Sequence, residues 1–300
     1  MAKKRDVIIG VIIAVSFVFA FVFFGLLVIG FLSPDSDFEF AGLGGNVGVV
    51  EMFGVIDEES GRPVIKLLDK WGENNSIKAV VVHINSPGGG VAISQELFDA
   101  IRRVKENKPV VAAMASVAAS GGYYIACAAD RIIANPGTVT GSIGVIFQFH
   151  TLQGLMDKIG VGTETVKSGD LKDVGTYSRS MTNEESLMLR SVVMDSYEQF
   201  VEVVSEGRDM ERDEVYLLAD GSLFTGLQAY NHGLIDTLGG LKEAVDLAAD
   251  LAGLEGEPSV VRPRERKQLT IFDLVQGVLG QAGRAAKDEL VGPELMFLYR

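Results

Sequence analysis

Cysteine and histidine are scarce in this chain of 300 residues. The single cysteine, Cys127, excludes an intrachain disulfide and the metal sites that need several cysteine ligands. The three histidines, His83, His150 and His232, are far apart, and none has the spacing of a metal ligand relative to Cys127 or to carboxylates. We therefore expect no metal and no other cofactor, and we interpret Cys127 as a small core residue.

Basic residues are also few, because 27 lysines and arginines are set against 40 aspartates and glutamates, for a net charge of −13. No basic stripe is available to neutralise a phosphate backbone, so nucleic acid is excluded as a partner. The short basic cluster at residues 262–267 is interpreted as a solvated linker. The glycine-rich segments fit neither of the common nucleotide-phosphate loops, and the sequence has no internal repeat.

Charged residues are missing altogether from Val7 to Leu32. As a helix, these roughly 26 residues would span about 39 Å, more than the ~30 Å hydrocarbon core of a bilayer. The run is too long for a cleaved signal peptide and has no good cleavage site after it. Basic residues precede the run and acidic residues follow it, so residues 1–6 are expected in the cytoplasm and the rest outside. We therefore predict a single-pass anchor at 7–32 in the cell membrane, followed by a linker at 33–46.

The body of the protein is expected at residues 47–253, where strand-like and helix-like segments alternate. This alternation predicts an α/β domain with parallel strands. Residues 254–300 are interpreted as a C-terminal tail with an amphipathic segment at 271–279. The expected strands are 47–53, 78–84, 110–115, 131–134 and 143–147, and the expected helices are 64–71, 91–106, 119–129, 151–159, 182–207, 211–219 and 241–253.

A serine stands among small residues at the expected end of a buried strand. Residues 116–124 read Ser-Val-Ala-Ala-Ser-Gly-Gly-Tyr-Tyr and follow an apolar run. The small neighbours leave the Ser120 hydroxyl unshielded, and Gly121 lets a backbone N–H approach whatever that hydroxyl attacks. Ser120 is therefore a candidate nucleophile at a strand-to-helix junction. The alternative is that the small residues serve only tight packing of a helix on a strand.

A second glycine-rich segment follows the strand expected at 78–84. Pro87 and the three glycines at 88–90 interrupt the apolar run, and a helical pattern begins at Val91. Glycine N–H groups at a helix N-terminus are free donors that suit a developing negative oxygen. The two glycine-rich segments together predict an oxyanion hole facing Ser120, and a plain tight turn is the alternative.

None of the three histidines has surroundings that indicate a general base for Ser120, and we interpret each of them as structural. The segment from 167 to 175 instead carries Lys167 and Lys172. A lysine can act as a general base when burial disfavours its ammonium form. Chemistry alone does not separate the two lysines.

Four segments, in this order, resemble the motifs of the SppA-type signal peptide peptidases, and the likeness covers about residues 47–250. The resemblance implies a serine–lysine protease with a Clp/crotonase-like α/β fold. No position of the motifs points to an inactive enzyme. The segments are Asn85-Ser-Pro-Gly-Gly-Gly90, Ala118-Ala-Ser-Gly-Gly-Tyr-Tyr124, Thr140-Gly-Ser-Ile-Gly-Val145 and the run from Lys167 to Asp173.

The resemblance also implies a role for individual residues. Ser120 matches the nucleophile and Lys172 the general base. Ser142 matches the hydroxyl that orients the lysine amine. The N–H groups of Gly89 and Gly121 match the oxyanion hole.

The remaining charged residues of the lysine segment need a separate interpretation. Lys167 matches a position with no role in proton transfer. Asp173 follows Lys172 directly, and a carboxylate near that amine would stabilise its charged form. We therefore expect Asp173, and with it Asp170, to point away from the amine.

The function implied is that of a membrane-anchored serine endopeptidase. Its substrates would be hydrophobic peptides, such as signal peptides left in the membrane after secretion. The resemblance further implies a homo-oligomer. The long helix from Thr182 has an apolar stripe that fits either the core or a subunit interface. The apolar end at 292–300 could pack on a neighbour, lie on the membrane or enter an active-site groove as a product-like peptide.

Other classes of protein share this fold. A catalytically inactive, membrane-tethered scaffold is the main alternative, because motifs do not demonstrate turnover. A crotonase-like acyl-CoA enzyme would find no coenzyme A outside the cytoplasm. A Ser-His-Asp mechanism of the Clp type is disfavoured by the lysine segment and by the positions of the histidines.

Overall fold

Eight strands form one sheet in the computed structural model, which describes residues 46–263. The strands are β1 (Val47–Phe53), β2 (Ala79–Ser86), β3 (Val110–Ala119), β4 (Arg131–Ala134), β5 (Val139–Gly141), β6 (Leu223–Thr225), β7 (Thr237–Leu238) and β8 (Val260–Val261). Their order is β6-β5-β3-β2-β1-β8, with β4 pairing to both β3 and β7. Every pair is parallel except β5 with β6. The α/β fold with a mainly parallel sheet is confirmed.

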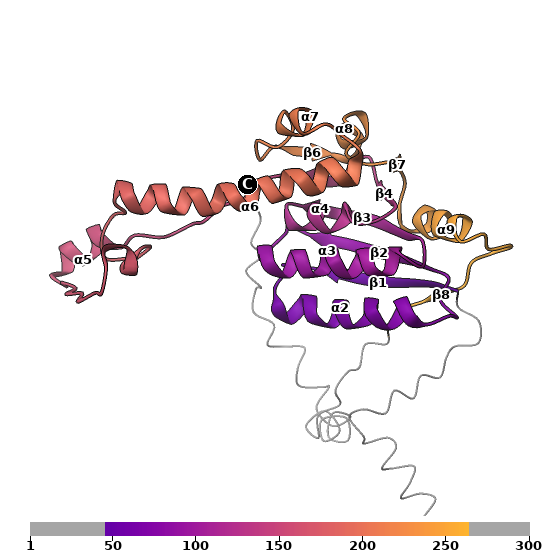
Figure 1. The fold of residues 1–300 in the computed structure, drawn as a ribbon, viewed down its shortest axis with the longest axis horizontal. Coiled ribbons are helices and arrows are strands. Elements are labelled where there is room, and N and C mark those ends of the chain that lie inside the picture. The colour runs from indigo at the N-terminus through magenta and orange to yellow at the C-terminus, as the bar shows by residue number, and fades with distance from the viewer. Residues whose placement is uncertain (1–45, 264–300) are drawn as a thin grey trace, which may run out of the picture.

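Helices lie on both faces of this sheet (Figure 1). They are α2 (Glu58–Glu73), α3 (Val91–Lys105), α4 (Gly121–Ala126), α5 (Gln153–Ile159), α6 (Asn183–Arg208), α7 (Arg212–Tyr216), α8 (Gly226–Asn231) and α9 (Leu241–Leu251), with a short 3-10 helix, η1 (Asp170–Asp173). Among residues 46–263, no helix combines the length and the apolar character needed to cross a bilayer. The predicted anchor at 7–32, most of the linker and the tail segments at 271–279 and 292–300 lie outside the described residues.

Alternate residues of the central strands pack into two cores. On β2, Val80 and Val82 face the larger core, which also contains side chains of α2, α3, α4 and α6. Val81, the residue between them, faces the smaller core under α9. A parallel strand covered on both faces is expected to be an almost continuous apolar run, as β2 is. The two cores keep the ends of β2 and β3, where the candidate site residues lie, on a rigid support.

Several predicted boundaries were wrong. No strand covers 143–147; the strand β5 lies earlier and ends at Gly141, where the backbone turns with φ +79. β3 continues to Ala119 instead of stopping at 115, because its second half pairs with β5 after its first half has paired with β4. The helix α4 is correspondingly shorter than predicted. The strand β8, which was not predicted, lies after residue 253 and pairs with β1.

The long helix α6 begins with the predicted capping box. The Thr182 hydroxyl accepts from the Glu185 N–H at 3.2 Å, and the Glu185 carboxylate accepts from the Thr182 N–H at 2.8 Å. Its C-terminal half is buried through Phe200, Val201 and Val204. Its N-terminal half projects beyond the sheet and leaves Leu187 69% exposed. The apolar stripe therefore divides into a core-facing half and an uncovered half.

Candidate active site

Ser120 stands between β3 and α4 in a backbone conformation that non-glycine residues rarely adopt. Its φ is 52° and its ψ is −120°. Such conformations cost of order 1–3 kcal/mol and persist only where the surroundings impose them. Here the Ser120 N–H donates to the Gly141 carbonyl at 2.8 Å, and the Ser120 carbonyl accepts from the Tyr124 N–H at 2.9 Å. The serine is therefore held from both sides by the backbone.

The two glycine-rich segments are in direct contact beside this serine. A Cβ atom on Gly88, whose φ is +101, would lie 2.7 Å from the Gly121 nitrogen and 2.9 Å from the Ser120 Cβ. A Cβ atom on Gly121 would lie 3.3 Å from the Gly89 nitrogen and 2.7 Å from the Ser94 hydroxyl. Only residues without a side chain permit this approach of backbone to backbone. The fold thus brings Ser120, Gly121 and Gly89 close together.

The N–H groups of Gly89 and Gly121 are unused donors. Gly121 is the first residue of α4 and has no helical acceptor, and neither group donates to any backbone acceptor within residues 46–263. The helix N-terminus adds a partial positive charge at this point. Two such donors next to a serine hydroxyl can stabilise an oxyanion that forms on an attacked carbonyl.

A pocket of about 110 Å³ opens against Ser120. Ser94 lines it too, but its hydroxyl donates to the Gly90 carbonyl at 2.8 Å and so has a partner. The pocket is therefore mainly apolar, which suits the side chain of a hydrophobic peptide. The other lining residues are Gly89, Val91, Gly121, Tyr124, Gly144, Val145, Ile146, Ser196 and Phe200.

Ser142 lies close to Ser120 through the backbone. It directly follows Gly141, whose carbonyl accepts from the Ser120 N–H. Ser142 also has a positive φ, 51°, and its N–H donates to the Ser222 carbonyl at 2.7 Å. A second constrained serine therefore stands at the edge of the site.

Lys172 is not brought to this pocket. It belongs to η1, which lies in the segment of residues 147–182, here called the arm. The arm contains α5 and lies at the projecting end of α6, well away from α4 (Figure 1). The described hydrogen bonds of residues 151–180 stay within the arm or reach Glu185 in the first turn of α6. Lys172 itself is exposed.

The other charged residues of the arm form a network. Asp173 is bound by Lys167, with Nζ 2.7 Å from Oδ1, and by Arg179, with Nη2 2.9 Å from Oδ1. These hydrogen bonds, that from Arg179 first, lower the pKa of Asp173 to about 2. The Asp173 carboxylate is thus occupied by two cations other than Lys172.

The histidines do not line the pocket at Ser120. His83 lies on β2 with its ring 5.1 Å from that of Phe53, and burial lowers its pKa. His150 is in the arm, and His232 packs against Phe224. Among the described residues, the geometry offers no histidine as the base for Ser120.

Comparison with known proteins identifies the family. The family model for "Peptidase family S49" matches residues 102–255, more than half of the chain, and the model for "Clp protease" matches residues 46–138. The chain belongs to peptidase family S49. It is therefore a protease, and the resemblance to the SppA-type peptidases is confirmed.

The relatives of this S49 protease carry names that agree. A protein of Synechocystis sp. (strain ATCC 27184 / PCC 6803 / Kazusa), "Putative protease slr0021", is 42% identical over 206 residues, which are 69% of this chain and 74% of that protein. The "Putative signal peptide peptidase SppA" of Enterococcus faecium is 41% identical over 180 residues, 60% of this chain and 52% of the relative. "Protease 4" of Haemophilus influenzae (strain ATCC 51907 / DSM 11121 / KW20 / Rd) is 34% identical over 259 residues, 82% of this chain and 41% of the relative. The match thus spans about half or less of the last two proteins.

Some residues of the candidate site were not recognisable from the sequence. Ser196 and Phe200 line the pocket from α6, about 80 residues after Ser120 in the chain. The spacing of apolar residues predicts that the helix has an apolar face, but it does not predict which surface that face contacts. Arg179 is one of many charged residues, and its two carboxylate partners meet it only through the fold of the arm.

Proposed function

We propose that this S49 protease is a serine endopeptidase in which Ser120 is the nucleophile and Lys172 the general base. The observation that carries the proposal is the placement of Ser120. A strained serine lies beside an apolar pocket, between two backbone N–H groups with no acceptor of their own. Such a constellation is suited to acyl transfer from a peptide.

The chemistry follows from these groups. Neutral Lys172 takes the proton of the Ser120 hydroxyl as Oγ attacks the peptide carbonyl, and the Gly89 and Gly121 N–H groups receive the oxyanion. The ammonium of Lys172 then gives its proton to the leaving amine. A water molecule, deprotonated by the same amine, hydrolyses the acyl-enzyme. One oxyanion donor contributes about 3 kcal/mol to lowering the barrier. The Ser142 hydroxyl orients the lysine amine.

The pairing of Ser120 with Lys172 requires a second copy of the chain. In one copy the arm carries Lys172 away from α4. The arm and the adjoining half of α6 also leave apolar side chains uncovered, among them Ile159 at 64% and Leu187 at 69% exposed. Large exposed apolar surfaces are typical of subunit interfaces. A homo-oligomer would cover them and bring the lysine of one copy to the serine of another.

The substrates are hydrophobic peptides, with signal peptides left after secretion as the leading class. The apolar pocket at Ser120 and the name of the Enterococcus faecium relative support this choice. The uncharged run of residues 7–32 supports a membrane anchor with the N-terminus in the cytoplasm and the protease outside. An anchored protease would meet such peptides where they are most concentrated.

The test is hydrolysis of a fluorogenic apolar peptide by the full-length chain in detergent. Ser120→Ala and Lys172→Ala should each lower turnover by at least about a thousandfold, because each removes a member of the reacting pair. Lys158→Ala, at an exposed lysine of α5 in the same arm, is the matched control and should keep the parental turnover. Activity in Lys172→Ala would contradict the assignment of the base. A parent chain that is silent with several apolar peptides in its native assembly would favour an inactive scaffold.

Mixing the two inactive variants tests the pairing between copies. Oligomers that contain both Ser120→Ala and Lys172→Ala chains have some sites with an intact serine from one copy and an intact lysine from the other. We expect the mixture to recover activity. A mixture that exchanges subunits and stays inactive would show that both residues come from the same copy.

A further inference from the structure

The carboxylate next to the proposed base has two partners of opposite charge. Asp173 follows Lys172 in η1, and its side chain is 16% exposed. Lys167 Nζ lies 2.7 Å from Oδ1, and the same Nζ donates to the Asp170 carbonyl at 2.9 Å. Arg179 binds both carboxylate oxygens, with Nη2 2.9 Å from Oδ1 and Nε 3.3 Å from Oδ2. Both oxygens of Asp173 are thus engaged inside the arm.

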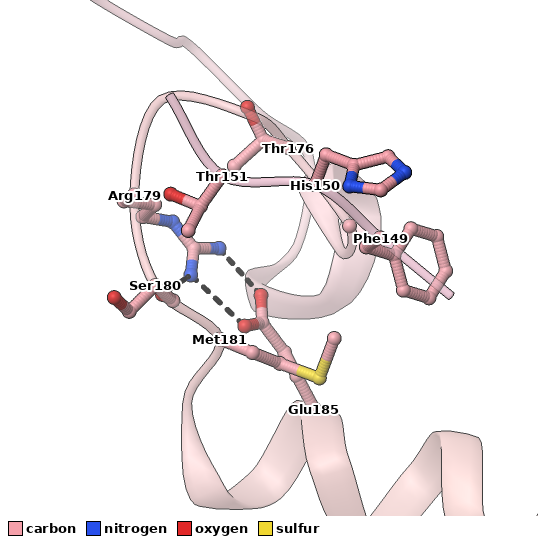
Figure 2. A pocket seen from close by; sticks show the side chains of 9 residues that line it. Phe149, His150, Thr151, Thr176, Arg179, Ser180, Met181 and Glu185 are labelled. Atoms are coloured by element: carbon pink, nitrogen blue, oxygen red, sulfur yellow. Dashed lines mark hydrogen bonds and ion pairs between the residues drawn. The ribbon is translucent and has the colours of Figure 1, made fainter. Parts of the chain in front are cut away.

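The guanidinium of Arg179 binds a second carboxylate, that of Glu185. Its Nη1 lies 2.9 Å from Oε2, and Nη2 also binds Oε1 (Figure 2). The Glu185 side chain is only 2% exposed and receives the Thr182 N–H as part of the capping box of α6. Arg179 therefore bridges η1 and the first turn of α6. The helix α6 continues from there into the core and lines the Ser120 pocket with Ser196 and Phe200.

This bridge has a consequence for Lys172. If Asp173 were released, its charge would be free to approach the neighbouring amine and would stabilise the ammonium form. An ammonium cannot accept the proton of Ser120. Within the described residues, the Lys172 side chain has no hydrogen bond or ion pair of its own, so its orientation depends on how η1 is held.

We infer that Arg179, assisted by Lys167, is a positioning residue for Lys172. It keeps the Asp173 carboxylate away from the amine and fixes η1 on the end of α6. This inference rests on the proposed role of Lys172 as the base. Nothing in the sequence pattern assigns a task to Arg179, and its bidentate fork suits two carboxylates in a way that lysine does not.

The charges around the bridge are balanced. Lys167 and Arg179 face Asp173 and Glu185, and His150 lines the same small pocket as Arg179 and Glu185, as Figure 2 shows. Hydrogen bonds from Arg179 lower the pKa of Glu185 to about 2, and that of Asp173 is about 2 as well. Both carboxylates are therefore ionised throughout the range in which a protease of this kind would work. Loss of either cation leaves the network with an excess negative charge beside Lys172.

The experiment is the pH profile of kcat/KM for the full-length assembled chain with a fluorogenic apolar peptide. In Arg179→Gln the acid limb should move to higher pH by about one unit, the size of shift that a nearby carboxylate gives. Adding Asp173→Asn to this variant should return the limb to its parental position, because the carboxylate is gone. Arg103→Gln, which removes an exposed arginine–carboxylate pair with Asp69 in the body, is the matched control and should leave the profile unchanged.

Lys167→Gln keeps the test decisive if Arg179→Gln does not assemble, since it removes one cation from Asp173 and leaves the bridge to Glu185. It should move the acid limb in the same direction by a smaller amount. The inference is wrong if assembled Arg179→Gln and Lys167→Gln both keep the parental limb, or if Asp173→Asn fails to restore it. Lys172→Ala separates this outcome from failure of the proposed function. If that variant is inactive, only the role of Arg179 is in question, and if it is active, Lys172 is not the base.

Discussion

At the scale of single residues, the site depends on the absence of side chains as much as on their presence. The Ser120 backbone has a positive φ and is held by backbone hydrogen bonds with Gly141 and Tyr124, not by its own hydroxyl. That hydroxyl makes no hydrogen bond within residues 46–263 and so stays available to a substrate. Gly88 and Gly121 leave the space in which the two unused N–H groups sit beside it.

A methyl group at Gly88 should disable the site. In Gly88→Ala the new Cβ would lie 2.7 Å from the Gly121 nitrogen, and the φ of +101 would be strained for alanine. We expect kcat/KM to fall at least a hundredfold and the free energy of unfolding to fall by about 1–3 kcal/mol. Peptide hydrolysis and thermal unfolding measure the two effects.

The matched control for that substitution is Gly137→Ala. Gly137 is exposed, and a Cβ atom added to it would meet no other atom within 4 Å, so activity and stability should both stay close to those of the parent. Full activity in Gly88→Ala would mean that the close approach of the two glycine segments is not needed for catalysis.

Individual site residues differ in how far the sequence reveals them. Ser120, Gly89 and Gly121 follow from local chemistry, because small residues at strand ends have a direct steric meaning. Ser142 is recognisable only through the family resemblance. The sequence around Arg179 does not predict its partners, since an arginine near several carboxylates can bind any one of them or face the solvent.

At the scale of elements, α6 joins two parts with different surroundings. Its last turns are packed in the core through Phe200 and Val204, while its first turn receives the Arg179 bridge through Glu185. Because α6 is one continuous helix, it fixes the position of the arm relative to the body. The capping box and the apolar stripe predicted the helix correctly, but not that half of the stripe would lie beyond the sheet.

Acid should loosen the arm before it unfolds the body. The pKa of Asp173 falls from 3.8 to about 2 and that of Glu185 from 4.5 to about 2, both mainly through hydrogen bonds from Arg179. Because these values are lower in the folded protein, the two carboxylates stabilise the arm above about pH 4. That contribution is lost as the pH falls through about 2. Hydrogen exchange of the amides at 167–182, followed from pH 6 to 2, should show protection falling over this window.

Two substitutions at adjacent positions check the cause. Glu185→Gln should lower protection at neutral pH and remove much of its dependence on acid. Glu184→Gln changes the exposed neighbouring carboxylate in the same turn and should behave as the parent. Equal acid sensitivity in all three proteins would assign the effect to groups outside the Arg179 bridge.

The elements that the sequence missed are the short ones. β6, α8 and β7 contain few residues, and the strands with which β6 and β7 pair are far away in the chain. The apolar run at 143–147 resembled a strand, but Val145 and Ile146 line the pocket at Ser120 instead. Periodicity identifies an apolar segment without specifying whether it pairs with a strand or lines a site.

At the scale of the whole molecule, the arm separates the proposed nucleophile from the proposed base. The body has a buried core on each face of its sheet. The arm and the first half of α6 instead expose large apolar side chains. Assembly is thus expected to complete the site and to cover these residues.

A charge on this uncovered surface should prevent assembly. Leu187 is 69% exposed on the first half of α6, so Leu187→Glu should leave the fold of one copy intact. Burying the carboxylate in an interface should weaken self-association at least tenfold, and peptide hydrolysis should fall with it. Mass photometry and the hydrolysis assay measure these two quantities.

Leu217→Glu is the control, because Leu217 is an apolar residue of the body that is 82% exposed. It should change neither assembly nor activity. If Leu187→Glu assembles as the parent does, the surface of α6 is not the interface, and the proposal that Lys172 acts on another copy loses its main support.

The sequence by itself determined the alternation of strands and helices, the junction at which Ser120 stands and the glycines that flank it. These are local properties, since apolar periodicity, capping and the steric freedom of glycine act within a few residues. Only the tertiary structure decided that the two glycine segments touch, that Asp173 binds Lys167 and Arg179, and that the arm, to which Lys172 belongs, lies away from α4. Such contacts depend on the order of the strands in the sheet and on the position at which α6 holds the arm. Both are set by residues far apart in the chain, so the local sequence does not predict them.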